Sequence, residues 1–121
     1  MKNKKLINSF KYAFSGIKSA FLSERNMKIH VSIALLVILF GFLLKIETWE
    51  WIVCIGYFAL VIGGECFNTA IEIVVNLAMP EINKDAKRSK DISAGGVLSF
   101  AIGSAIVGLI IFVPKIIALF K

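Results

Sequence analysis

Hydrophobic residues gather in three long runs, separated by short segments in which polar and charged residues dominate. The runs cover residues 29–46, 51–79 and 92–120. A membrane-spanning helix needs about 20 mostly apolar residues. The pattern therefore predicts a single-domain, all-α membrane protein (1–121) with three transmembrane helices joined through a short turn and a charged loop, 80–91. The second run would form a helix roughly 43 Å long, so its end should project beyond a hydrocarbon core of about 30 Å.

The segment before the first run, residues 1–28, has a different pattern. Apolar side chains recur every three or four residues, from Leu6 through Phe10, Phe14 and Ile17 to Phe21. This spacing places them on one face of a helix, with lysines on the other. We expect an amphipathic helix over 3–22 that lies in the membrane interface, followed by a joint. The alternative is a surface helix packed on a soluble core, but the sequence leaves little from which to build such a core.

Composition and charge support this assignment and suggest an orientation. Of 121 residues, 58% are hydrophobic, and the formal net charge is +6. Basic residues concentrate before the first run and in the 80–91 segment, which predicts that both lie in the cytoplasm and that the C-terminus lies outside. In a soluble protein such a charge would suggest nucleic acid. Here lipid head groups and nucleotide phosphates are the expected partners.

A stripe of polar residues interrupts the second apolar run. Glu65, Asn68, Glu72 and Asn76 are spaced by three, four and four residues, so they share one helical face. Ionisable residues at membrane depth are costly and usually functional, and two carboxylates call for a shared cation or proton. The alternative is a polar seam that joins helices. Asparagines fit a seam well, whereas two glutamates fit it poorly.

The residues of the stripe are expected to lie at different depths in the membrane. Glu72 lies roughly 10 Å closer to the cytoplasm than Glu65, which places Glu65 at the depth of a lipid hydroxyl. Glu24, at the joint, can reach the level of Glu72. In the charged segment, Lys90 can meet a phosphate as a flexible point charge. Asp91 can either orient this lysine or cap the third helix.

Two further observations narrow the chemistry. The sequence contains neither a GxxxxGK[ST] phosphate loop nor a protein-kinase signature, which excludes the common soluble kinase classes. The single histidine, His30, stands at the start of the first run. We interpret it as a hydrogen-bonded residue at a helix interface rather than a metal ligand.

These residues resemble a known family. The element E-x-x-N-T-A-I-E at 65–72 and the element Ser89–Lys90–Asp91 resemble the prokaryotic diacylglycerol kinases. The segments SERN at 23–26 and GLIIFVPK at 108–115, together with His30, are more similar to the undecaprenol kinase branch of that family. The chain departs from the family pattern in having Ser89 for an alanine and Asn76 for an aspartate.

The resemblance implies a bacterial cell-membrane enzyme that works as a homotrimer, with active sites between neighbouring subunits. It implies that Glu65 is a general base and that Glu24 and Glu72 bind Mg²⁺ and nucleotide. Further nucleotide-binding positions are implied at Lys90, Asp91, Tyr12 and Glu81, and weaker ones at Lys5, Ile82 and Asn83.

The expected function is phosphoryl transfer from ATP, with magnesium, to a lipid alcohol. Such a reaction needs positioning and charge neutralisation more than covalent machinery. In this hypothesis Glu65 takes the proton of the hydroxyl, Asn68 holds the region by hydrogen bonds, and Lys90 steadies the phosphates. Undecaprenol is the expected acceptor and diacylglycerol the alternative. An alternative of another class is a small oligomeric proton or cation conductor, in which Lys90 and Asp91 would have no role.

Overall fold

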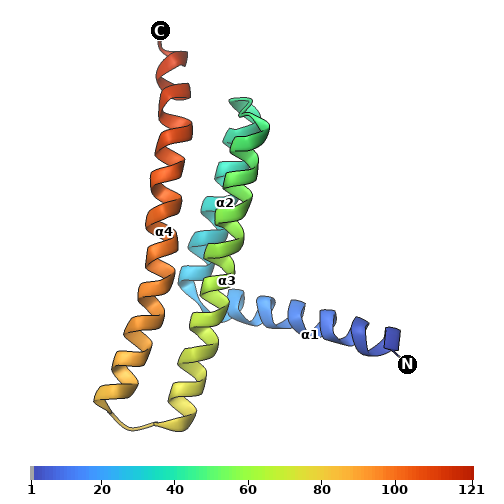
Figure 1. The fold of residues 1–121 in the computed structure, drawn as a ribbon, viewed down its shortest axis with the longest axis vertical. Coiled ribbons are helices and arrows are strands. Elements are labelled where there is room, and N and C mark those ends of the chain that lie inside the picture. The colour runs from blue at the N-terminus through green and yellow to red at the C-terminus, as the bar shows by residue number, and fades with distance from the viewer. Residues whose placement is uncertain (1) are drawn as a thin grey trace.

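The computed structural model describes residues 2–121, which form four helices joined by short turns. These are α1 (Lys2–Ser23), α2 (Arg25–Leu43), α3 (Thr48–Ala78) and α4 (Lys84–Leu119). The helices α3 and α4 run side by side as a long hairpin, α2 packs against α3, and α1 projects sideways (Figure 1). The all-α prediction is confirmed, and α2, α3 and α4 are each long and apolar enough to cross a membrane.

The predicted loop over 80–91 is wrong in its second part, because α4 begins at Lys84. The side-chain oxygen of Asn83 accepts the backbone N–H groups of Asp85 and Ala86, at 2.9 and 3.0 Å. This is an N-cap, and it satisfies donors that would otherwise have no partner in the first turn. The expectation that Asp91 caps this helix is therefore also wrong. Hydropathy alone predicts a loop for residues 84–91, because they are polar and charged. The N-cap at Asn83 instead starts a helix there.

The hairpin is longer than a bilayer is thick. With 31 residues in α3 and 36 in α4, the helices extend about 46 and 54 Å at 1.5 Å per residue. Figure 1 shows the closed end of the hairpin continuing past the level of α1. If α1 lies in the interface, this closed end stands in water.

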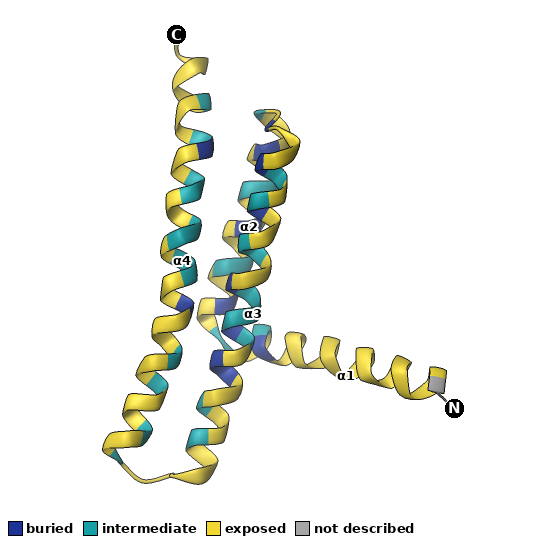
Figure 2. Cartoon of the chain, in the orientation of Figure 1, coloured by how far each residue is buried: buried dark blue, intermediate teal, exposed yellow. Residues whose placement is uncertain are grey.

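Two glycines allow α3 and α4 to approach each other closely. A Cβ atom added at Gly103 would lie 2.9 Å from the ring of Tyr57, and one added at Gly64 would lie 3.1 Å from the ring of Phe100. Lipid tails are as apolar as the helices, so close packing of small residues contributes strongly to helix association in membranes. Accordingly, the buried positions of α3 form a line along the helix, while the outward surfaces are exposed (Figure 2).

The turn between α2 and α3 is held by local backbone geometry. Lys45 adopts a left-handed φ of 53°, and the N–H of Ile46 reaches back to the carbonyl of Gly41 at 3.1 Å. This is the usual way in which a helix ends with its last carbonyls satisfied. Ile46 then packs with Cys54 and Ile111, so the turn brings all three long helices together at this end.

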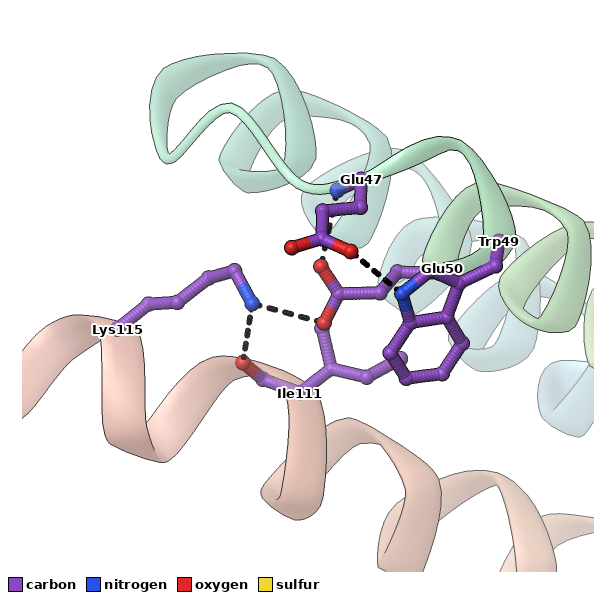
Figure 3. Close-up of polar contacts among 5 residues, drawn as sticks. All are labelled: Glu47, Trp49, Glu50, Ile111 and Lys115. Atoms are coloured by element: carbon purple, nitrogen blue, oxygen red, sulfur yellow. Dashed lines mark hydrogen bonds and ion pairs between the residues drawn. The ribbon is translucent and has the colours of Figure 1, made fainter.

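An ion pair joins α3 to α4 near the turn between α2 and α3. Glu50 is only 4% exposed. Its Oε2 accepts a hydrogen bond from Nζ of Lys115 at 2.7 Å (Figure 3). Its Oε1 accepts the backbone N–H of Glu47 at 2.9 Å. Both carboxylate oxygens therefore have a donor, which is what a buried charge requires.

We predict that Lys115→Met destabilises the fold by about 3–5 kcal/mol, because it leaves the charge of Glu50 buried without a partner. The matched control is Lys87→Met, which removes an ion pair of equal length, 2.7 Å to Asp91, on an exposed surface. The control should leave the stability nearly unchanged, because an ion pair between solvent-exposed side chains contributes little. Reversible unfolding in mixed micelles measures both variants. Equal losses for the two would contradict a structural role for the buried pair.

Candidate active site

The polar stripe of α3 is buried at its deep end and opens toward the hairpin tip. Glu65, at 2% exposure, and Asn68 are buried, Glu72 is half-buried, and Asn76 is exposed. The Nδ2 group of Asn68 donates to Oε1 of Glu72 at 3.5 Å. The stripe is therefore a polar path, a row of polar side chains along one face of an otherwise apolar helix, as its spacing indicates.

Glu65 has a partner from another helix. The Nε2 atom of His30, on α2, lies 3.2 Å from Oε1 of Glu65. The interpretation of His30 as a hydrogen-bonded residue at a helix interface agrees with this contact. Its partner was not predicted, because the two residues are far apart in the sequence and only the packing of α2 on α3 brings them together.

Two polar atoms of the stripe region are buried and have no hydrogen-bond partner among residues 2–121. They are Oδ1 of Asn68 and Oγ1 of Thr69. A buried acceptor without a donor costs about 1–3 kcal/mol, so such atoms mark places that a ligand can satisfy. Asn68 already gives its N–H to Glu72, which leaves its carbonyl oxygen available to a ligand between the two glutamates.

Glu24 is the half-buried residue that joins α1 to α2. The end of α1 that precedes it lines a pocket together with Cys66 and Thr69 of α3, so the joint lies at the level of the stripe. Within residues 2–121, no three side chains of the His, Cys, Asp or Glu types converge to form a metal-binding cluster. A cation held by this chain alone would thus have two of these carboxylates at most.

A groove at the closed end of the hairpin gathers several of the predicted nucleotide-binding residues. Its volume is about 280 Å³. Its lining residues come from the end of α3, the connecting turn and the start of α4: Asn76, Met79, Pro80, Glu81, Ile82, Asn83, Ala86, Lys87 and Lys90. Asn76 belongs to the stripe as well, so the stripe leads from Glu65 into this groove.

Other predicted residues are placed differently. Asp91 pairs with Lys87 rather than with Lys90, so in this chain it does not orient Lys90. Asn83 lines the groove, but its side-chain oxygen is engaged in capping α4. Lys5 and Tyr12 lie exposed on α1, which projects away from the hairpin (Figure 1). A single chain does not bring them to the groove.

Known proteins share this sequence pattern. Residues 11–112 match the family model described as prokaryotic diacylglycerol kinase. The chain is 39% identical to an undecaprenol kinase of Bacillus subtilis, over 93% of this chain and 91% of that protein. It is 37% identical to a diacylglycerol kinase of Synechocystis, over 94% of this chain and 66% of that protein. It is 35% identical to a diacylglycerol kinase of Haemophilus influenzae, over 87% and 86%.

Proposed function

Because the chain belongs to the prokaryotic diacylglycerol kinase family of multi-pass membrane lipid kinases, we propose that it phosphorylates undecaprenol with MgATP. The product is undecaprenyl phosphate. The observation that carries this proposal is the polar path on α3. Its polar side chains follow one face of the helix from the buried carboxylate of Glu65 to Asn76, which lines the groove together with Lys90.

The choice of undecaprenol over diacylglycerol is supported by sequence likeness. The relative named undecaprenol kinase matches over nine-tenths of both chains. The SERN and GLIIFVPK segments and His30 also resemble that branch. The physical requirements are the same for either acceptor, because each presents a hydroxyl at the same depth.

In the proposed reaction Glu65 acts as the general base. Its carboxylate takes the proton of the lipid hydroxyl while the hydroxyl oxygen bonds to the γ-phosphorus of ATP. The bond from that phosphorus to the bridging oxygen breaks, and ADP leaves. A positioned base contributes on the order of 10²–10⁴ in rate. The hydrogen bond from Asn68 holds Glu72 in place two turns further along the same face.

Glu24 and Glu72 would hold the magnesium ion of MgATP. Mg²⁺ prefers oxygen ligands and is usually held by one or two carboxylates together with substrate phosphates. When bound, the ion would neutralise phosphate charge. Lys90 and Lys87 line the groove and would receive the phosphates.

A homotrimer with active sites shared between subunits would explain why some predicted site residues lie far from the groove of their own chain. Lys5 and Tyr12, exposed on the projecting helix α1, would reach the groove of a neighbouring subunit. On α4, Gly95 and Gly96 would have no atom within 4 Å of an added Cβ, which leaves room for close approach of another helix. The distribution of basic residues supports a cytoplasmic N-terminus and hairpin tip, with the C-terminus outside.

The function is tested by offering purified protein MgATP with either undecaprenol or diacylglycerol at equal mole fraction in mixed micelles. We expect the higher kcat/KM with undecaprenol. A preference for diacylglycerol would reverse the choice of acceptor. ATP that is not consumed with either lipid would contradict the kinase proposal and favour the proton or cation conductor, which ion-flux measurements in vesicles would then detect.

Substitution of each of the two stripe glutamates should impair a different step of the reaction. Glu65→Gln removes an interaction made in the transition state, so kcat should fall by about 10²-fold or more with MgATP binding nearly unchanged. Glu72→Gln should abolish activity by weakening MgATP binding, because a metal ligand is lost. Titration with a fluorescent ATP analogue compares them. Equal loss of MgATP affinity in both would place the two carboxylates in one metal site.

Activity should disappear when subunits separate. A site that needs α1 of a neighbour is incomplete in a monomer, because Lys5 and Tyr12 on α1 are then missing from the groove. The measurement is specific activity during dilution in detergent, with mass determined in parallel. The finding that would refute shared sites is full specific activity in samples proven to be monomeric.

A further inference from the structure

The contact between His30 and Glu65 has no role in the reaction as described so far. It joins two helices within the apolar part of the fold, with 20% of the His30 side chain and 3% of the Glu65 side chain exposed. Across residues 2–121, it is also the one hydrogen-bonding or ionic contact made by the Glu65 carboxylate. A buried carboxylate with a single partner depends on that partner for its orientation.

We propose that His30 is a positioning residue, which fixes the Glu65 carboxylate for proton transfer from the lipid hydroxyl. This inference rests on the proposed function, since it assigns a partner to the base of that reaction. His30 acts on Glu65 and not on the substrate phosphates.

The two carboxylate oxygens of Glu65 have different surroundings and can take different roles. Oε1 lies 3.2 Å from Nε2 of His30, a distance at which a protonated ring nitrogen donates a hydrogen bond. With Oε1 held, Oε2 remains to accept the proton of the acceptor. A glutamate side chain has three rotatable torsions, and a base must stand within about 2.6–3.2 Å of the proton donor that it serves. One fixed oxygen restricts those torsions.

The burial of Glu65 makes a donor at this place important. Its carboxylate is almost wholly removed from solvent, and a buried charge without a partner is costly. His30 provides that partner by direct contact. In a site from which water is excluded, such a hydrogen bond is stronger than in water.

The surroundings of His30 suit a role with the lipid acceptor and not with the nucleotide. Its ring helps to line a cavity of about 220 Å³ between α2, α3 and α4. The other lining residues are mostly apolar, and Ser104 is a polar exception. His30 thus stands where the polar path of α3 meets an apolar space, and the groove of Lys90 is lined by other residues. A defect at His30 should therefore affect turnover and leave nucleotide binding intact.

The test compares His30→Leu, which removes the donor, with His30→Gln, whose amide nitrogen can occupy the place of Nε2. Ser32→Ala is the matched control, because it removes a polar group from the same helix at an exposed position whose hydroxyl donates to the carbonyl of Lys28 and not to Glu65. Values of kcat and of KM for MgATP are measured with the lipid acceptor in mixed micelles. We expect His30→Leu to lose about 10-fold or more in kcat with KM for MgATP within about twofold. His30→Gln should recover most of the loss, and Ser32→Ala should match the unmodified protein.

A second background tests whether His30 acts through Glu65. Effects of residues in one network are not additive, so in Glu65→Gln the further change His30→Leu should leave the residual turnover unchanged. Additive losses would overturn the proposal, as would unchanged kcat in His30→Leu or no recovery in His30→Gln. If His30→Leu does not fold, His30→Asn, whose amide is too short to reach, takes its place. An unmodified protein without kinase activity would instead refute the proposed function.

Discussion

The fold depends on one constraint, that a carboxylate buried among apolar helices must have a donor. Helix α3 carries two such carboxylates, Glu50 and Glu65, and each finds its partner on a different helix. Lys115 of α4 meets Glu50, and His30 of α2 meets Glu65. The two glutamates are about 22 Å apart along α3. Because lipid gives little hydrophobic drive for helices to associate, these contacts and the close packing at glycines fix where α2 and α4 lie.

The two pairs differ in how completely they satisfy the carboxylate. Both oxygens of Glu50 accept hydrogen bonds, one from Lys115 and one from the backbone of Glu47. Glu65 has a partner on one oxygen. A fully satisfied carboxylate stabilises structure, whereas one with an available oxygen can take a proton. In the proposed reaction the same residue type on the same helix would therefore serve two purposes, one structural and one catalytic.

The sequence predicts the parts of this molecule that depend on local pattern. The three apolar runs, the amphipathic N-terminal helix and the common face of the polar stripe all follow from helical periodicity, and the helices are confirmed. The start of α4 was missed, because a cap at Asn83 outweighs the polar character of residues 84–91. The partners of Glu50 and Glu65 could not be predicted, since they depend on which helices pack together.

The helical start of α4 matters for the chemistry proposed here. A nucleotide arrives from water and a lipid alcohol from the bilayer, so their binding groups must be held in register across the interface. The stripe from Glu65 to Asn76 spans about 16 Å of continuous helix, and Asn76 and Lys90 both line the groove. Because Lys90 stands on a capped helix and not on a flexible loop, its distance from Glu65 is set by two packed helices. Phosphoryl transfer depends mostly on positioning, and a rigid hairpin provides it.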